Sequence, residues 1–229
     1  MNFKALRGLP HALLLIGSVA ITALPGISAA QAAPVRVVAL GDSLTAGYGL
    51  PPSEAFPAQL EVALKARGHD VVVENAGVSG DTATQGLARL DWSVPQGTQA
   101  VIVALGANDM LRGLPPEVTR TALNNIVVRL KARGLPVLVS GMRAAPNLGE
   151  SYRARFDAIY PELAQKQQVR LHPFFLEGVA GSPNLNQPDG LHPTGKGVAR
   201  MVEGILPDVE QLVEEARKKA ELEEQNPAP

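Results

Sequence analysis

Apolar and polar positions along the chain predict strands and helices in alternation. Short, nearly continuous apolar runs, typical of strands buried in a parallel sheet, occur at residues 36–40, 71–73, 101–105, 137–139 and, more weakly, 169–171. Segments with helical spacing lie between these runs. This order predicts an α/β domain with a parallel sheet and helices on both of its faces.

The intervening segments carry apolar residues at intervals of three and four, which is the spacing of one helix face. Three such faces are expected to form helices, over residues 56–64, 123–130 and 156–163. Gly68 and Gly134 each follow a basic residue, and both are natural points for a helix to end. A final helix is expected over residues 198–213, with a break near Pro207.

The N-terminal segment has the features of a secretory signal peptide. Lys4 and Arg7 precede an uncharged, mostly apolar run over residues 12–24, and the sequence Ala-Gln-Ala that ends at Ala32 fits a cleavage site. We therefore expect residues 1–32 to be removed, with the cut after Ala32. The alternative is an uncleaved N-terminal anchor. The cleaved protein is expected in the periplasm or outside the cell, without stable membrane insertion.

The rest of the chain has the composition of one globular domain. We expect this domain to span residues 33–209, followed by a charged helix end and tail over residues 210–229. The 229 residues are 45% apolar and 19% charged, and their net charge of −1 argues against a nucleic-acid partner. The absence of cysteine excludes disulfides and thiolate chemistry. A monomer is expected.

Polar, glycine-rich segments follow the predicted strands, where parallel α/β sheets carry their sites. They are Gly41–Leu44 after the first strand, Asn75–Asp81 after the second, Gly106–Asp109 after the third, and Asp189–Pro193 near the end of the chain. Because the carboxyl ends of parallel strands meet at one edge of the sheet, we expect one common site. Asp42 and Asp81 are expected to accept hydrogen bonds that stabilise their turns.

Together these segments contain the groups that an acyl-transfer site needs. Ser43 can act as a nucleophile when a base lies within hydrogen-bond reach, and His192 fits that role. Asp189, three residues earlier, can orient the imidazole and stabilise its protonated form. The N–H groups of Ser43 and Gly80 and the side-chain amide of Asn108 can donate hydrogen bonds to the developing oxyanion. The alternative for each residue alone is a turn or capping role.

Elimination among the four histidines also leads to His192. His11 lies in the expected signal peptide, His69 lies in a Gly-His-Asp turn, and His172 lies between a strand and a proline. The sequence H-E-x-x-H is absent, as is G-x-G-x-x-G, so neither a metal site nor a dinucleotide site is expected. Residues 190–197 imitate a phosphate-binding loop but lack its final Ser or Thr. We expect no metal and no cofactor.

Six stretches of the chain form a family-specific set: four of them contain these segments, and two more lie between them. They are residues 40–48, 75–82, 85–90, 105–113, 158–161 and 189–193. Together they resemble the SGNH hydrolases, also called the GDSL family, and within it a bacterial periplasmic branch of thioesterases, lysophospholipases and arylesterases. The four residues that name the family would be Ser43, Gly80, Asn108 and His192, and Asp189 would complete the triad.

The resemblance implies a three-layer α/β/α fold with a flavodoxin-like, five-stranded parallel sheet. It also implies metal-independent hydrolysis of small-molecule esters and thioesters, with acyl, aryl or lysophospholipid groups, through an acyl-serine intermediate. Residues 110–114 would be able to move over an acyl-binding groove. The expected lining of this groove is Leu44, Met110, Leu111, Arg112, Leu114, Phe175 and Leu191. For the apolar residues the alternative is ordinary packing, and for Arg112, which would meet a phosphate or carboxylate, it is a solvated surface position.

Two other functions stay open at this point. A carbohydrate O-deacetylase on the same fold would act on short, polar acyl esters and would be indifferent to long chains. A non-catalytic binding protein has no need of an ordered nucleophile, base and orienting carboxylate, so the set Ser43, Asp189, His192 and Asn108 argues against it. The sequence therefore favours a serine esterase or thioesterase.

Overall fold

Five parallel strands in the order β2–β1–β3–β4–β5 form the centre of the protein. The structure is a computed structural model that describes residue 1 and residues 33–226, so the expected signal peptide lies outside the described residues. The strands are β1 (Val35–Gly41), β2 (Val71–Gly77), β3 (Ala100–Ala104), β4 (Val137–Ser140) and β5 (Arg170–His172). All five expected strands are confirmed, although β2 continues beyond its apolar run to Gly77.

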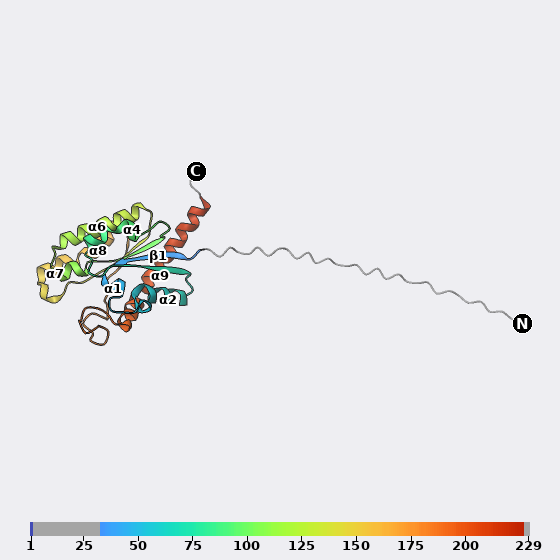
Figure 1. The fold of residues 1–229 in the computed structure, drawn as a ribbon. Helices are drawn as coiled ribbons and strands as arrows, with labels where there is room; N and C mark the ends of the chain where they lie inside the picture. Colours follow the sequence, from blue (N-terminus) through green and yellow to red (C-terminus); the bar gives the residue numbers. More distant parts are fainter. Residues whose placement is uncertain (2–32, 227–229) are drawn as a thin grey trace. The chain divides into compact units, whose positions relative to one another are not determined.

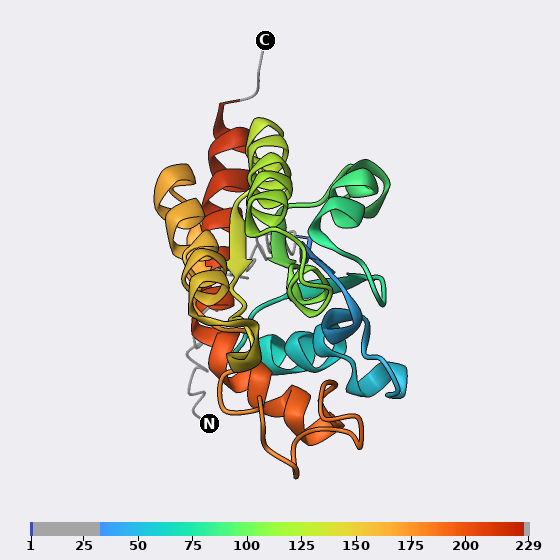
Figure 2. The ribbon, with the colours of Figure 1, turned by 90° about the vertical axis from the view of Figure 1, so that its left-hand side faces the viewer.

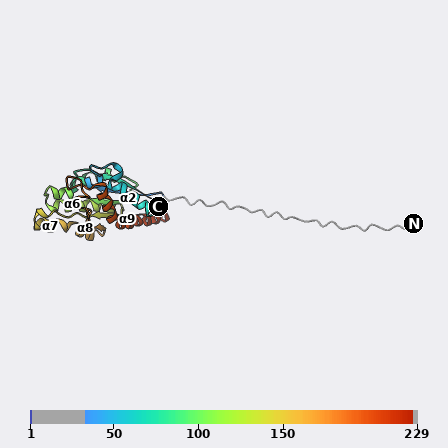
Figure 3. The ribbon, with the colours of Figure 1, turned by 90° about the horizontal axis from the view of Figure 1, so that it is seen from below.

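Helices cover both faces of this sheet, as the apolar runs predict. The helices are α1 (Ser43–Ala46), α2 (Phe56–Ala66), α3 (Ala83–Ala88), α4 (Leu90–Ser93), α5 (Ala107–Leu111), α6 (Pro116–Ala132), α7 (Glu150–Asp157), α8 (Ile159–Gln167) and α9 (Gly195–Gln225), with short 3-10 turns η1 (Pro52–Glu54) and η2 (Pro146–Leu148). Figures 1 and 3 show α2 and α9 together on one side of the strands and α6 and α8 on the other. The central strands β3 and β4 are therefore buried along their whole length.

The expected helix over residues 156–163 is two helices, α7 and α8, which meet at Ala158. Pro161 explains the break, because it has no N–H to donate to the carbonyl of Asp157 and its ring crowds that carbonyl. The other two expected helices are confirmed as α2 and α6. They end near Gly68 and Gly134, whose N–H groups donate to the carbonyls of residues 65 and 131.

The final helix does not break at Pro207, so this expectation is wrong. Helix α9 continues from Gly195 to Gln225, and the boundary expected at residue 210 falls inside it. Apolar side chains before and after the proline, such as Ile205, Val209 and Leu212, are buried in the core. Packing on both sides offsets the cost of about 3 kcal/mol for a proline in a helix. Among the described helices, α9 included, none combines the length and apolar character needed to cross a membrane.

The strand order brings the loops after β1 and β3 together. The chain leaves β1 toward β2 on one side, whereas β3 leads to β4 on the other, so the direction of the connections reverses between these two neighbouring strands. Helices α1 and α5 begin at this place, directly after β1 and β3. The long segment that leads into α9 (orange) lies at the same end of the domain as α1 (blue) in Figure 2. The fold thus gathers the polar segments that follow the strands.

Candidate active site

Ser43 is the first residue of the four-residue helix α1, immediately after β1. Asp42 caps this helix, because its Oδ1 accepts a hydrogen bond from the N–H of Leu44 at 3.0 Å. Gly77 lets β2 approach closely, since a Cβ there would lie only 2.3 Å from the backbone nitrogen of Ala46. The hydroxyl of Ser43 is thereby held on a tight turn at the edge of the sheet.

Ser43, His192 and Asp189 form a continuous series of polar contacts. The hydroxyl oxygen of Ser43 lies 3.0 Å from Nε2 of His192, across a separation of 149 residues in the chain. Nδ1 of His192 lies 2.6 Å from Oδ2 of Asp189. The three expected residues are thus brought together, in the geometry by which a base activates a hydroxyl and a carboxylate orients the base.

The turn that carries His192 is fixed to the α1 loop by Gln187 and Tyr48. The backbone N–H of Gln187 donates to the carbonyl of His192 at 2.7 Å, and the Gln187 side-chain amide donates to the carbonyl of Tyr48 at 2.7 Å. The rings of Tyr48 and His192 have centroids 4.5 Å apart. Sequence reasoning assigned no role to Gln187 or Tyr48, because neither forms a recognisable motif with the histidine.

The carboxylate of Asp189 is stabilised in its ionised form. The backbone N–H of His192 donates to it at 3.0 Å and, with the His192 side chain and the N–H of Leu191, lowers the pKa of Asp189 from 3.8 to about 2. Asp189 is therefore an anion throughout the neutral range, although its side chain is accessible to solvent. An anion at this place can accept the N–H of the neighbouring imidazole and so hold the ring in one orientation.

Asn108, in α5, and Gly80, in the loop after β2, lie on two further segments of the site. The side-chain amide of Asn108, in α5, donates one hydrogen bond to the carbonyl of Asp81 at 3.0 Å, which leaves its second N–H for another acceptor. Gly80 has φ of +87°, a conformation that favours glycine. Among residues 33–226, the backbone N–H groups of Ser43 and Gly80 have no hydrogen-bond acceptor. These groups are suited to bind an oxyanion.

Asp109 is a buried carboxylate that fixes the start of α5. Its Oδ2 accepts from the backbone N–H of Ala83 at 2.8 Å, and its Oδ1 accepts from the hydroxyl of Thr119 at 3.0 Å. The side chain therefore connects α5 to α3 and α6. Sequence reasoning placed Asp109 in the site segment without a role, and its partners lie 26 and 10 residues away in the chain.

Asp42 is a second buried carboxylate at the site. Its burial is the largest effect on it and raises the pKa from 3.8 to about 7, while the hydrogen bond from Leu44 opposes the shift. Its Oδ2 has no hydrogen-bond partner in the described part of the chain. Asp42 stabilises its turn through Oδ1, as expected, and Asp81 also accepts a hydrogen bond, but from the distant Arg89.

The residues expected to line an acyl groove fall into two groups. Leu44, Met110 and Phe175 are buried in the core, and Phe175, only 1% exposed, packs edge-on against Phe56 at 4.9 Å. The alternative of ordinary packing therefore fits Phe175. The remaining residues are at least partly accessible: Leu111, Arg112, Leu114 and Leu191. Arg112 donates to the carbonyl of Gly80 at 2.6 Å, so it contacts the site loop itself.

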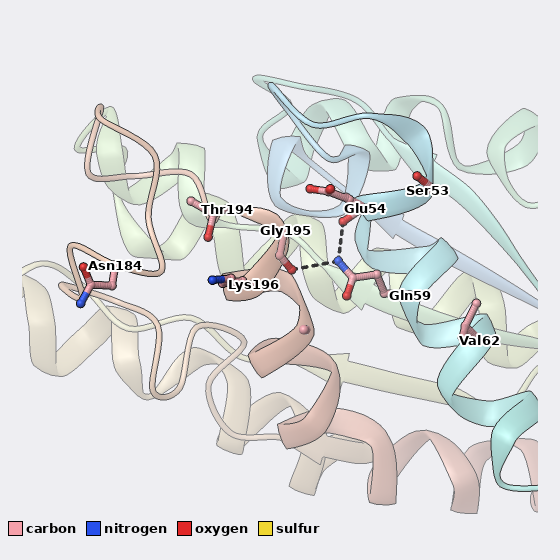
Figure 4. Close-up of a pocket in the computed structure, with 9 residues that line it drawn as sticks. Ser53, Glu54, Gln59, Val62, Asn184, Thr194, Gly195 and Lys196 are labelled. Carbon is pink, nitrogen blue, oxygen red and sulfur yellow. Dashed lines mark hydrogen bonds between the residues drawn. The ribbon is translucent and has the colours of Figure 1, made fainter.

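A separate cavity of about 770 Å³ lies between α2 and the start of α9, and neither Ser43 nor His192 lines it. Figure 4 shows Gln59 at its centre, where the side-chain amide donates to the carbonyls of Glu54 and Gly195 at 2.8 and 3.0 Å. Of its lining, only Thr194, Gly195 and Lys196 belong to a segment considered from the sequence as a possible site, residues 190–197. Within residues 33–226, no three histidine, aspartate or glutamate side chains come together as metal ligands would.

A serine, a histidine and an aspartate in series at the carboxyl edge of a parallel sheet define the class of serine hydrolases. Residues 39–200 match the GDSL-like lipase/acylhydrolase family. The chain belongs to this family, and the protein is a serine ester hydrolase.

Three similar proteins support this assignment. An arylesterase of Vibrio mimicus is 45% identical over 168 residues, which cover 73% of this chain and 84% of that protein. The thioesterase 1/protease 1/lysophospholipase L1 of Escherichia coli is 39% identical over 183 residues, which cover 80% of this chain and 86% of that protein. The crystal structure of AlinE4, an SGNH-hydrolase family esterase, is 46% identical, has a TM-score of 0.68, and covers 79% of this chain and 97% of its own. The expected fold is confirmed.

Proposed function

We propose that Ser43 is the nucleophile, His192 the general base and acid, and Asp189 the orienting carboxylate of this esterase. The observation that carries the proposal is the unbroken series of contacts, 3.0 Å from Ser43 Oγ to His192 Nε2 and 2.6 Å from His192 Nδ1 to Asp189 Oδ2. The ionised state of Asp189 supports it further, because a permanent anion stabilises the imidazolium that forms during the reaction.

In the first half of the reaction, Ser43 Oγ attacks the carbonyl carbon of the ester while its proton passes to Nε2 of His192. The carbonyl oxygen becomes an oxyanion that accepts hydrogen bonds from the N–H groups of Ser43 and Gly80 and from the amide of Asn108. The tetrahedral intermediate then collapses. The bond to the leaving group breaks, His192 gives its proton to the departing oxygen or sulfur, and the acyl group stays on Ser43.

In the second half, water takes the place of the leaving group. His192 removes a proton from the water, whose oxygen attacks the acyl carbon, and the same donors stabilise the second oxyanion. The bond from the acyl carbon to Ser43 Oγ then breaks, and His192 returns the proton to Ser43. The carboxylic acid departs, and each group of the site has its starting protonation state.

Exposed apolar side chains on the site loops favour substrates with an apolar acyl or aryl group. Tyr48 follows α1, Val78 precedes Gly80, Leu111 ends the helix that carries Asn108, and Leu191 precedes His192. Leu111 and Leu191 are 51% and 50% exposed, so they offer apolar surface beside Asn108 and His192. Similarity to a thioesterase adds thioesters to the proposed substrates.

The proposal is tested with p-nitrophenyl esters from acetyl to palmitoyl and with an acyl-CoA series. Ser43→Ala is expected to lower kcat by about 10⁴-fold or more, because no other group takes over the attack. Ser151→Ala, at an exposed position on α7, is the matched control and is expected to keep the wild-type rate. Full activity in folded Ser43→Ala would overturn the proposal. Activity on acetyl esters of carbohydrates alone would instead favour an O-deacetylase.

We also propose that the chain is exported, cleaved after Ala32, and active as a monomer in the periplasm or outside the cell. Lys4, Arg7 and the apolar run of residues 12–24 support export. The mass of the protein recovered from the periplasm is expected to correspond to a chain that begins at Ala33, and light scattering is expected to give a monomer mass. A full-length mass in the membrane fraction would contradict export with cleavage.

A further inference from the structure

Arg89 is a buried arginine at the junction of α3 and α4, with its guanidinium directed at the loops of the site. It is only 7% exposed. Nη2 donates to the carbonyl of Gly41 at 2.7 Å, Nη1 donates to the carbonyl of Ala76 at 2.8 Å, and Nε donates to Oδ2 of Asp81 at 2.5 Å. Nη1 also donates to the hydroxyl of Ser93 at 2.9 Å. One side chain thus holds the ends of β1 and β2 and the loop that follows β2.

These contacts require the planar shape of an arginine. Gly41 and Ala76 lie at the carboxyl ends of two paired strands, and the carbonyl of Gly41 also accepts a hydrogen bond from the backbone N–H of Val78 at 3.1 Å. A guanidinium offers five N–H groups in one fixed plane and can reach both carbonyls and the carboxylate together. A lysine ammonium, on its flexible stem, has three donors and cannot reproduce this arrangement. The Asp81 carboxylate balances the buried charge of Arg89.

Asp81 connects Arg89 to the expected oxyanion donors Gly80 and Asn108. Its backbone nitrogen follows Gly80 directly and donates to the carbonyl of Val78 at 3.1 Å. Its own carbonyl accepts the hydrogen bond from the side-chain amide of Asn108 at 3.0 Å. The contacts of Arg89 therefore run from Gly41, two residues before Ser43, through Asp81 to Gly80 and Asn108.

We propose that Arg89 is a positioning residue that sets the oxyanion donors Gly80 and Asn108 relative to the nucleophile Ser43. The proposal rests on the function proposed above for these three residues. Arg89 does not touch the substrate. It acts through Asp81 and the carbonyl of Gly41, which hold the two loops at a fixed separation.

This role predicts a specific kinetic effect. Misplaced oxyanion donors weaken binding of the tetrahedral intermediate but not of the ground-state ester, so kcat falls while KM stays nearly constant. Removing an oxyanion donor outright lowers kcat by about 10²–10³-fold in other enzymes. A displaced donor keeps part of its effect. We therefore expect Arg89→Lys to lower kcat for p-nitrophenyl butyrate by about 10-fold or more, with KM within about two-fold of the wild type.

The test combines Arg89→Lys with Asn108→Ala in a double-mutant cycle. If Arg89 acts through the donors, Arg89→Lys is expected to lower kcat by a smaller factor in the Asn108→Ala background than in the wild type, because only Gly80 is then left to be displaced. Arg129→Lys, which changes an exposed arginine paired with Asp91, is the matched control and is expected to keep the wild-type kcat. All rates are measured at a temperature well below the thermal unfolding midpoint of each variant, so that every protein is folded during the assay. A purely structural role would give the same fold-loss in both backgrounds, and this result would overturn the proposal.

Asp81→Asn provides a second, nearly isosteric variant that interrupts the same connection. Asp81→Asn is expected to give the same loss in kcat and the same non-additivity with Asn108→Ala. If Arg89→Lys does not fold, Asp81→Asn is used in its place. Wild-type kcat in Asp81→Asn or in folded Arg89→Lys would refute the positioning role. Ser43→Ala is measured in parallel. If Ser43→Ala is inactive and Arg89→Lys is fully active, only the role of Arg89 falls, whereas an active Ser43→Ala refutes the proposed function itself.

Discussion

Asp42 is buried beside the proposed nucleophile, and its replacement by asparagine is expected to change how stability depends on pH. Asp42 is only 1% exposed, and its burial raises the pKa from 3.8 to about 7. In the unfolded chain the same carboxyl has a pKa of about 3.9. Between about pH 4 and pH 7 the folded protein therefore binds one more proton at this residue than the unfolded chain does.

The sign and size of the effect follow from this difference in bound protons. Where the folded state binds the extra proton, the free energy of unfolding falls by about 1.4 kcal/mol for each pH unit gained. The folded pKa of about 7 places this loss between about pH 4 and pH 7. Across that interval the contribution of Asp42 falls by about 4 kcal/mol, which corresponds to about 10 °C in Tm for a domain of this size.

Asn at position 42 resembles the neutral carboxyl and keeps the acceptor for the N–H of Leu44. Asp42→Asn is thus expected to match the wild type within about 1 kcal/mol at pH 4, where Asp42 is neutral in the folded protein, and to be more stable by up to about 4 kcal/mol at pH 8.5. Urea unfolding followed by circular dichroism at several pH values measures this difference. Asp91→Asn, at an exposed position, is the matched control.

Comparing variant with wild type at each pH cancels the titration of all groups that the two proteins share. If Asp42→Asn differs from the wild type by the same free energy of unfolding at pH 4 and at pH 8.5, the pKa of Asp42 is not raised by burial. The same conclusion holds if the exposed control shows as large a change with pH as Asp42→Asn.

Two further substitutions separate groups that act in the reaction from groups that stabilise the core. Asn108→Ala is expected to lower kcat by about 10²–10³-fold without raising KM, since it removes an oxyanion donor, and steady-state kinetics with unchanged kcat would contradict this role. Phe175→Ala is expected to lower the free energy of unfolding by about 3–5 kcal/mol in urea titrations, because its ring fills the core against Phe56. If Phe175→Ala instead raises KM for long-chain esters and leaves the free energy of unfolding unchanged, Phe175 lines the acyl groove.

The strands and the position of the site could be predicted from the sequence because both depend on local patterns. Continuous apolar runs mark β1, β3 and β4, which are buried on both faces. In a parallel sheet every strand ends at the same edge, so the polar segments after β1, β2 and β3 are expected at one site. Asp189–Pro193 follows no strand directly, and its place beside Ser43 is predicted by the need of a serine for a base and by the family resemblance. The structure brings Ser43 and His192 to 3.0 Å.

The residues that support the site could not be predicted in the same way, because their contacts join distant parts of the chain. Arg89 reaches Gly41 across 48 residues, and Gln187 reaches Tyr48 across 139. Arg89 has two local signals: it belongs to the family-like stretch of residues 85–90, and it lies between the apolar residues Leu87 and Leu90. A charged residue in such a place needs a buried partner.

The two prolines within expected helices show why local rules alone do not fix helix ends. Pro161 lies near the start of a short helix, and the chain bends at Ala158. Pro207 lies inside α9, where buried residues on both sides keep the helix continuous. Tertiary packing decides between these outcomes, and the sequence near each proline does not reveal it.

The most direct test of the central claim is the site of covalent labelling by a p-nitrophenyl alkylphosphonate. In this reaction the activated serine oxygen attacks phosphorus, p-nitrophenolate leaves, and the phosphonyl group stays on the protein. We expect one adduct per chain on the peptide that contains Ser43, loss of esterase activity in proportion to labelling, and no adduct on Ser43→Ala. Labelling of a different residue, or full esterase activity after Ser43 has been labelled, would contradict it.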